Sequence, residues 1–122
     1  MKIEKGMYVR LENGLIFKTE TVNKFEYGCP YDFNLSGYNL KVKDISNTSH
    51  NLIDLIEVGD YVNGQQVVKI VEAHKHYPKI ICLEHAFNDE GNCLNITNTR
   101  DIKEILTKEQ YEANVFRVEE EQ

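Results

Sequence analysis

The sequence has no long apolar run in its 122 residues and no apolar segment near its start. A membrane-spanning helix needs roughly 20 apolar residues, and no stretch approaches that length. The opening Met1-Lys2-Ile3-Glu4-Lys5 also lacks the apolar centre of a signal peptide. We therefore expect a chain without a membrane span that stays in the cytoplasm where it is made.

Cysteine is scarce, with only Cys29, Cys82 and Cys93. A small odd number is typical of a reducing compartment rather than of a secreted disulfide scaffold. Cys82 lies in an apolar run, where a thiol usually packs rather than reacts, and the sequence offers no base for Cys29. We predict three free thiols and no cysteine nucleophile.

Positive charge is outnumbered, because 14 Lys and Arg stand against 20 Asp and Glu, which gives a formal net charge of -6. General binding to DNA, RNA or anionic lipid relies on clustered Lys and Arg. The charge balance therefore argues against such binding. Part of the acidic excess lies in Glu119-Glu120-Glu121, and we interpret residues 119–122 as a solvated acidic tail.

Motifs that carry catalysis are missing too. The sequence has no Gly-rich phosphate loop and no dinucleotide-binding fingerprint. Asp89 and Glu90 are adjacent, but neighbouring side chains in a loop diverge, which makes them a poor acid and base pair. We predict a protein that is not an enzyme, with no catalytic residue and no cofactor.

A metal site has one candidate pattern. His74 and His76 are two residues apart, so on a strand both imidazoles would point the same way. Cys82 and His85 follow downstream, yet their spacing of three places them on opposite faces of a strand, and all four would converge only if the chain bends. The alternative is a polar loop beside a buried Cys82. We predict no metal site.

Strand patterns dominate what is present. Met7 to Leu11 alternates, with Met7, Val9 and Leu11 on the face expected in the core, and after Glu12-Asn13-Gly14 an extended pattern resumes over residues 15–22. These features predict a β-hairpin. Further on, residues 40–43 are typical of a short strand and residues 47–50 of a loop.

A second hairpin is predicted around Asn63-Gly64, a pair that favours a tight turn, with the β-branched run 66–71 behind it. The residues before each hairpin share one pattern, Glu-x-Gly-x-Tyr-Val, at Glu4–Val9 and Glu57–Val62. This indicates two related β units, although glycine before an aromatic and a β-branched residue is also good local strand chemistry anywhere.

The last third predicts a strand over residues 79–84 and either a strand or a helix start over residues 101–106. Thr107 with Gln110 three residues later is a capping box, so we expect a short helix that ends at Asn114, and then a strand over residues 115–118. The fold class we predict is mainly β, a single domain over residues 1–118, built as a small SH3-like barrel or a curled antiparallel sheet with a short C-terminal helix.

Aromatic and arginine side chains are the candidate ligand-binding residues, because stacking and charge-assisted hydrogen bonds suit a nucleotide or another flat anion. We expect Tyr8 and Arg10 on the outward face of the first strand, with Phe17, Arg100 and Arg117 joining them if the sheet curls. Tyr31 and Phe33 lie in an aromatic segment rich in turn residues, over residues 27–38, which is typical of a binding loop. The alternatives are rings that cover an open barrel end, and a surface for a protein partner.

Three stretches carry a resemblance to a known family: Gly6–Arg10, Asn51–Gly64 and Ile102–Tyr111 with the closing Phe116-Arg117-Val118. They resemble a family of small uncharacterised proteins from phages and prophages of Gram-positive bacteria. The resemblance implies a phage origin and a β fold, and it assigns no catalytic or binding residue. Residues 25–50 show no resemblance to any known family.

A phage origin implies an accessory role inside the host bacterial cell, since such small proteins often act against host immunity. We expect a counter-defence protein that binds and sequesters an immune nucleotide signal, with homo-oligomerisation as a way to complete a pocket. The alternatives are an anti-CRISPR-like inhibitor that binds a host defence protein, and a KOW- or Tudor-like module associated with nucleic acid.

Overall fold

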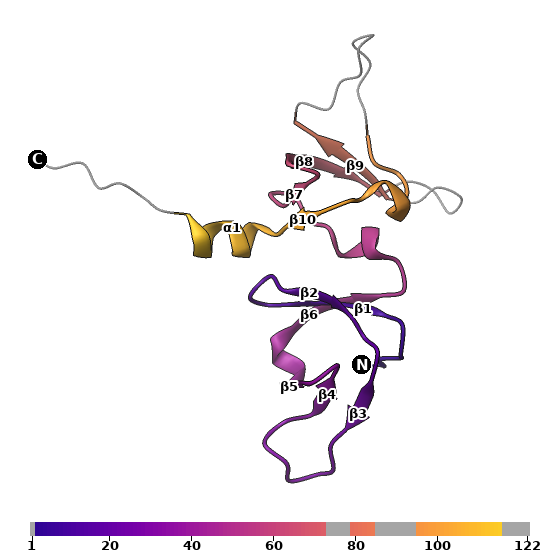
Figure 1. Ribbon diagram of the computed structural model, residues 1–122, viewed down its shortest axis with the longest axis vertical. Helices are drawn as coiled ribbons and strands as arrows, with labels where there is room; N and C mark the ends of the chain where they lie inside the picture. The colour runs from indigo at the N-terminus through magenta and orange to yellow at the C-terminus, as the bar shows by residue number, and fades with distance from the viewer. Residues whose placement is uncertain (1, 73–78, 85–94, 116–122) are drawn as a thin grey trace, which may run out of the picture.

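The computed structural model describes residues 2–72, 79–84 and 95–115, and short β-strands dominate it (Figure 1). The strands are β1 Tyr8–Leu11, β2 Ile16–Lys18, β3 Val22–Lys24, β4 Phe33–Leu35, β5 Tyr38–Leu40, β6 Ile45–Ser49, β7 Tyr61–Val62, β8 Gln65–Val71, β9 Ile80–Leu83 and β10 Ile105–Leu106. They form three antiparallel sheets with the strand orders β2-β1-β6, β3-β4-β5 and β10-β7-β8-β9. The predicted mainly β class is confirmed, and the described strands form separate small sheets rather than a closed barrel.

The first predicted hairpin is present. β1 and β2 pair antiparallel with Tyr8 opposite Lys18, and the turn between them contains Gly14 at φ +90°. Few residues other than glycine adopt that backbone conformation. The turn is closed by hydrogen bonds from the Gly14 N–H to the Leu11 carbonyl, 2.9 Å, and from the Leu11 N–H to the Leu15 carbonyl, 2.8 Å.

The second predicted hairpin is present as well. β7 and β8 pair with Tyr61 opposite Gln66. Asn63 and Gly64 form the turn with φ values of +52° and +80°. Two consecutive residues with positive φ are the hallmark of the two-residue turn that matches the twist of a hairpin, and Asn-Gly is its preferred sequence.

The two Glu-x-Gly-x-Tyr-Val copies, Glu4–Val9 and Glu57–Val62, have the same backbone geometry. In each copy the N–H of the fourth residue donates to the carbonyl of the first at 3.1 Å, and the glycine has a positive φ, +92° in one and +99° in the other. Each glycine N–H also donates to the returning strand region, to the Thr19 carbonyl at 2.8 Å or the Val67 carbonyl at 2.9 Å. The sequence repeat is therefore a repeat of local structure.

Two local predictions in the first half are wrong. Residues 40–43 do not form a strand, because β5 ends at Leu40 and a 3-10 helix, η1 Val42–Asp44, follows. Residues 47–49, expected in a loop, belong to β6, which pairs with β1 along its length. The polar sequence of β6 gives no alternation, so its strand conformation follows from the ladder to β1 rather than from a local pattern.

The C-terminal helix matches its prediction. α1 spans Lys108–Asn114, the Thr107 hydroxyl accepts from the Gln110 N–H at 3.3 Å, and the Gln110 side chain accepts from the Thr107 N–H at 3.0 Å. Figure 1 shows α1 projecting sideways from the end of β10. No helix in the described part of the chain has the length and apolar character to cross a membrane. The strand predicted over residues 115–118 lies outside the described residues beyond Val115.

Buried side chains form two separate hydrophobic clusters, one in each half of the chain. The first contains Ile3, Val9, Leu11, Phe33, Leu35, Leu40 and Ile45. The second contains Ile53, Ile56, Val62, Val67, Ile81, Leu83 and Ile96. We call residues 2–51 the N-lobe and the described residues from 52 to 115 the C-lobe, which begins with the 3-10 helix η2 Leu52–Leu55 and includes η3 Thr99–Asp101. Figure 1 shows the two lobes stacked along the long axis of the molecule.

Candidate functional site

Arg10 lies on β1 where the two lobes meet, and its side chain is fully buried. Both terminal nitrogens bind the Asp60 carboxylate, with Nη2 2.9 Å from Oδ1. Nη1 also donates to the Leu55 carbonyl at 2.9 Å, and Nη2 donates to Glu109 Oε2 at 2.7 Å. Nε lies 3.1 Å from Glu57 Oε2 without the alignment of a hydrogen bond. We call these five residues the Arg10 network.

Asp60 is held in place by backbone donors as well as by Arg10. Its Oδ2 accepts from the Glu57 N–H at 2.7 Å, and its Oδ1 accepts from the Lys108 N–H at 2.9 Å. Burial alone would lower the pKa of Arg10, but the hydrogen bonds to Asp60 and the charges of Asp60, Glu57 and Glu109 raise the pKa above its ordinary value. The guanidinium is therefore charged and fixed, and it joins the N-lobe to the C-lobe.

The expectation that Arg10 faces outward is wrong. Val9 and Leu11 belong to the N-lobe cluster, as predicted, but the opposite face of β1 is covered by the C-lobe at Arg10. A charged residue is found fully buried only where other groups pair with it, and here Asp60, fifty positions along the chain, does so. Arg10 is a structural link between the lobes and not part of an exposed binding face.

The turn of the first hairpin forms a second contact between the lobes. Thr107, at the start of α1, is fully buried, and its hydroxyl donates to the Gly14 carbonyl at 2.9 Å. A Cβ placed on Gly14 would lie 2.2 Å from the Thr107 hydroxyl oxygen and 2.9 Å from Glu109 Cβ. The two lobes thus approach each other closely enough at this point that only glycine fits.

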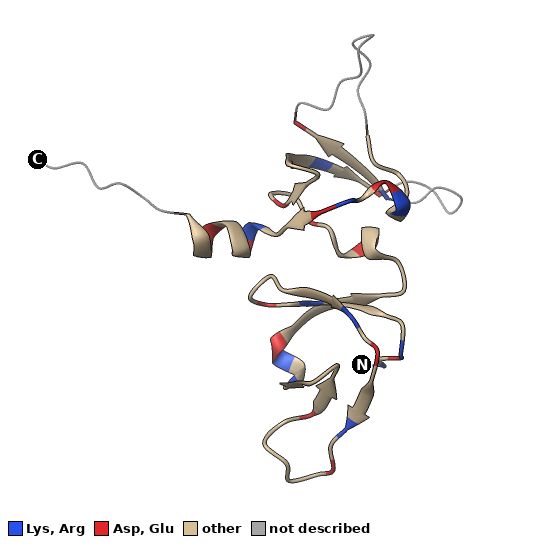
Figure 2. Ribbon diagram, viewed as in Figure 1, with Lys and Arg blue, Asp and Glu red and all other residues tan. Residues whose placement is uncertain are grey.

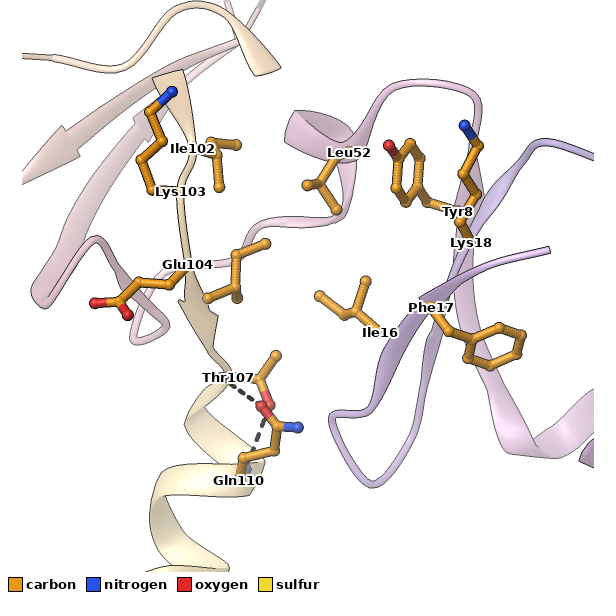
Figure 3. A pocket seen from close by; sticks show the side chains of 11 residues that line it. Tyr8, Ile16, Phe17, Lys18, Leu52, Ile102, Lys103, Glu104, Thr107 and Gln110 are labelled. Carbon is orange, nitrogen blue, oxygen red and sulfur yellow. Dashed lines mark hydrogen bonds between the residues drawn. The ribbon is translucent and has the colours of Figure 1, made fainter. Parts of the chain in front are cut away.

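A groove of about 340 Å³ lies between the lobes next to these contacts (Figure 3). The N-lobe wall includes Tyr8, Ile16 and Lys18, and the C-lobe side includes Leu52 and Ile102. Figure 3 shows the aliphatic side chains of Ile16, Leu52 and Ile102 around the gap, while the carboxylate of Glu104 points away from it. We call this space the interlobe groove. Its walls are mainly apolar, which suits a ligand with a flat or aliphatic body.

Polar groups lie at the edge of the interlobe groove. The Lys18 ammonium lies 5.7 Å from the centre of the Tyr8 ring, close enough for a cation–π contact. Gln110 lines the opposite wall, and in Figure 3 its amide nitrogen is directed toward the gap. The groove therefore combines an aromatic ring, a cation and an amide donor.

Two of the predicted ligand-binding residues, Tyr8 and Phe17, line the groove. The ring of Phe17 points away from the gap in Figure 3 and packs against Tyr38, with ring centroids 4.9 Å apart. Tyr8 is thus the aromatic side chain of the predicted set that is best placed for a ligand in this groove.

The other predicted residues are dispersed. Phe33, expected in a binding loop, is instead 7% exposed and part of the N-lobe cluster, because it lies on β4 with its side chain among the other buried residues. Tyr31 and Arg100 are exposed but do not line the groove. Arg117 lies outside the described residues.

Sequence reasoning missed Lys18, Leu52, Ile102 and Gln110 as groove residues. The hairpin register contained a signal for Lys18, because the turn length sets it opposite Tyr8. Leu52 and Ile102 carry no local signal, since they become neighbours of Tyr8 only when the lobes meet.

The metal site considered from the histidine pattern cannot be assessed, because its histidines are not among the described residues. His74, His76 and His85 lie outside the described residues, and Cys82 is a half-buried free thiol. In the part of the chain that the structure describes, no three His, Cys, Asp or Glu side chains form a group that could hold a metal ion.

Comparisons with known proteins found no match to this chain among protein-family models, curated proteins or solved structures.

Proposed function

We propose that this chain is a non-enzymatic binding protein that holds a small ligand in the interlobe groove, and that this ligand is a nucleotide signal of host defence. The observation that carries the proposal is the groove itself. Its volume, about 340 Å³, falls within the range of roughly 300–1,000 Å³ for small-molecule sites, and apolar walls with a few polar groups are typical of such sites.

The groups at the groove edge favour a flat, anionic ligand. Tyr8 offers an aromatic face for a base, and Lys18 beside it offers a positive charge for a phosphate. Stacking on a ring tolerates any base, so the arrangement supports the nucleotide class without selecting one base.

Sequestration requires affinity for the nucleotide but no catalysed reaction. A protein made in excess of a signalling nucleotide lowers the free concentration of that nucleotide whenever its dissociation constant is below the concentration of the signal. The resemblance to small phage proteins supports this role, because removal of a host immune signal favours replication of a phage. We place the protein in the cytoplasm of the infected bacterium, where such a signal would be made.

A second candidate function is inhibition of a host defence protein. The observation in its favour is a group of exposed aromatic rings on the N-lobe, where Tyr27 is fully exposed and Tyr31 and Tyr38 are 40% and 44% exposed. Exposed tyrosines often become central contacts in protein interfaces. The groove gives no support to this alternative, which is why we rank it second.

Thermal unfolding with added nucleotides tests the proposal. The probes are cyclic AMP, cyclic GMP, cyclic di-AMP and cyclic ADP-ribose, and at least one should raise the melting temperature in a concentration-dependent way. Leu52→Trp should remove that rise because the larger ring fills the groove. The matched control is Val68→Trp, at an exposed position of β8 that does not line the groove.

The outcomes show whether a nucleotide binds and whether it binds in the interlobe groove. If no probe stabilises the wild-type chain, the nucleotide proposal is wrong. If a probe stabilises the wild type and both tryptophan variants equally, the ligand binds somewhere other than the interlobe groove. Melting curves of each variant without ligand verify that both remain folded.

A further inference from the structure

A second hollow adjoins the interlobe groove on the N-lobe. It is open to solvent and is lined by Lys5, Gly6, Lys18, Thr19, Glu20 and Thr21. Lys18 lines both the hollow and the groove. The groove and the hollow therefore share one lining side chain, that of Lys18.

The hollow is lined by two lysines that form no ion pair with the described residues. Among the described residues, Lys2 pairs with Glu4 and Lys108 pairs with Glu57, but neither Lys5 nor Lys18 forms an ion pair with a carboxylate. Both are exposed. Two ammonium groups without a carboxylate partner, one of which contacts the Tyr8 ring, are suited to bind an oxyanion such as phosphate.

The remaining groups define what else a phosphate would meet. The buried Thr19 hydroxyl already donates within the N-lobe, to the Glu4 or the Met7 carbonyl at 2.9 Å. Thr21 is exposed, so its hydroxyl lies at the surface of the hollow. Glu20 is an exposed acid in the same hollow, and its charge would oppose an anion. The lysines are thus the attractive groups, and Glu20 is the repulsive one.

The internal repeat provides a comparison for this charge. The residue equivalent to Lys5 in the second Glu-x-Gly-x-Tyr-Val copy is Val58, and the residue opposite its tyrosine is Gln66 where the first copy has Lys18. The backbone of the two copies is the same, but only the N-lobe copy has the two cations. Strand geometry alone therefore does not require lysine at either position.

From this arrangement we infer that the open hollow is a phosphate subsite, in which Lys5 and Lys18 bind the phosphate of a nucleotide whose base lies in the interlobe groove against Tyr8. The inference rests on the proposed function and adds the orientation of the ligand and the residues that bind its charge. Lys18 contacts both parts of the ligand, and Lys5 contacts only the phosphate.

Isothermal titration of nucleotides and their nucleosides tests the subsite. The probes are cyclic AMP and cyclic GMP beside adenosine and guanosine, with the wild-type chain and the Lys5→Gln/Lys18→Gln variant. The double variant should bind the preferred cyclic nucleotide about tenfold or more weakly, and its binding should depend less on salt. Its affinity for the matching nucleoside should stay within about twofold of wild type.

Matched variants separate local charge from net charge. Lys24→Gln/Lys43→Gln removes two exposed N-lobe lysines that do not line the hollow and should leave affinity within about twofold of wild type. Glu20→Gln should tighten nucleotide binding. Melting curves without ligand confirm that each variant is folded, because Lys18 also contacts the Tyr8 ring.

The failures are distinguishable. If nucleotides bind and the Lys5→Gln/Lys18→Gln variant binds them as tightly as wild type, the subsite is wrong while the proposed function stands. If a nucleoside binds as tightly as its nucleotide, the groove holds a ligand but the phosphate inference is again wrong. If neither the nucleosides nor any of the four cyclic nucleotides of the thermal unfolding test bind, both the proposed function and the subsite are wrong.

Discussion

Each lobe contains the same six-residue pattern, and the fourth position of the pattern is Met7 in the N-lobe and Asp60 in the C-lobe. Each of these side chains accepts a hydrogen bond from the N–H of the first residue of its copy, at 3.2 Å for the Met7 sulfur and 2.7 Å for Asp60 Oδ2. The local role is shared, but only Asp60 carries a charge that can bind Arg10. The hydrogen bond within each turn is local, whereas the contact between the lobes depends on the fourth position, where only the C-lobe copy has a carboxylate.

The residue after each Tyr-Val shows the same contrast. In the N-lobe the residue is Arg10, which crosses to the C-lobe and binds Asp60. In the C-lobe it is Asn63, which turns the chain and stays within its own lobe, where its side-chain oxygen accepts from the Lys103 N–H at 2.7 Å. At equivalent positions, therefore, one residue binds across the junction and the other stabilises its own lobe. In Figure 2 the ribbon of α1 contains acidic positions, coloured red, beside the basic position at its start.

The largest expected difference is between two single substitutions, one at the fourth position of each copy. Asp60→Ala leaves Arg10 buried without its main partner and should lower the free energy of unfolding by about 3–5 kcal/mol. Met7→Ala removes a half-buried, uncharged side chain and should cost only about 1 kcal/mol. Urea unfolding of both variants measures the difference, and equal losses would show that the Arg10 network is not what joins the lobes.

The hairpin glycines give the next largest contrast. Gly14→Ala combines a positive φ with a Cβ 2.2 Å from the Thr107 hydroxyl, so we expect a loss of about 3 kcal/mol in the free energy of unfolding. Gly64→Ala has similar backbone strain but its nearest neighbour is 4.0 Å away, so about 1–2 kcal/mol is expected. The same denaturation measurement applies. A Gly64 variant as unstable as the Gly14 variant would mean that the close approach of the lobes contributes nothing.

A smaller effect is expected at Thr107. Thr107→Val keeps the shape of the side chain but removes the hydroxyl that caps α1 and donates to the Gly14 carbonyl, for a loss of about 1–2 kcal/mol. Thr107→Ser keeps the hydroxyl and is the control. Thermal unfolding should rank wild type above the serine variant and the serine variant above the valine variant, and the reverse order of the two variants contradicts the capping role.

The smallest effect is expected at an exposed ion pair within the C-lobe, next to the junction. Lys108 Nζ lies 2.8 Å from Glu57 Oε1, and this hydrogen bond is the main reason that the pKa of Lys108 is raised. Both side chains are well exposed, at 44% and 39%, so Lys108→Gln should change the free energy of unfolding by less than about 1 kcal/mol. A loss as large as that of Asp60→Ala would contradict the account in which the buried Arg10 network, and not this exposed pair, provides the main stabilising contacts.

Features set by neighbouring residues were predictable from the sequence. The Asn63-Gly64 turn, the Gly14 turn and the Thr107 to Gln110 capping box each depend on a few residues in a row, and all three are present as expected. The repeat of Glu-x-Gly-x-Tyr-Val also signalled a repeat of backbone geometry, since a glycine with positive φ starts both units.

Features set by distant residues were not predictable in the same way. The local sequence predicts an exposed Arg10, because its partner Asp60 is distant in the chain. It predicts Phe33 in a loop, because the pairing of β4 with β3 and β5 is not visible in the local sequence. β6 is too polar to show a strand pattern, and its conformation follows from pairing with β1. The interlobe groove likewise exists only once two lobes with separate cores are joined.

The most direct test of the account is a double-mutant cycle on Arg10 and Asp60. The variants are Arg10→Met, Asp60→Asn and the pair together, with the free energy of unfolding measured by urea denaturation. If the buried ion pair joins the lobes, the double variant should be more stable than the sum of the single losses predicts, by about 2–3 kcal/mol. Losses that add to within about 0.5 kcal/mol would show that Arg10 and Asp60 stabilise the protein independently, and the account of the junction would be wrong.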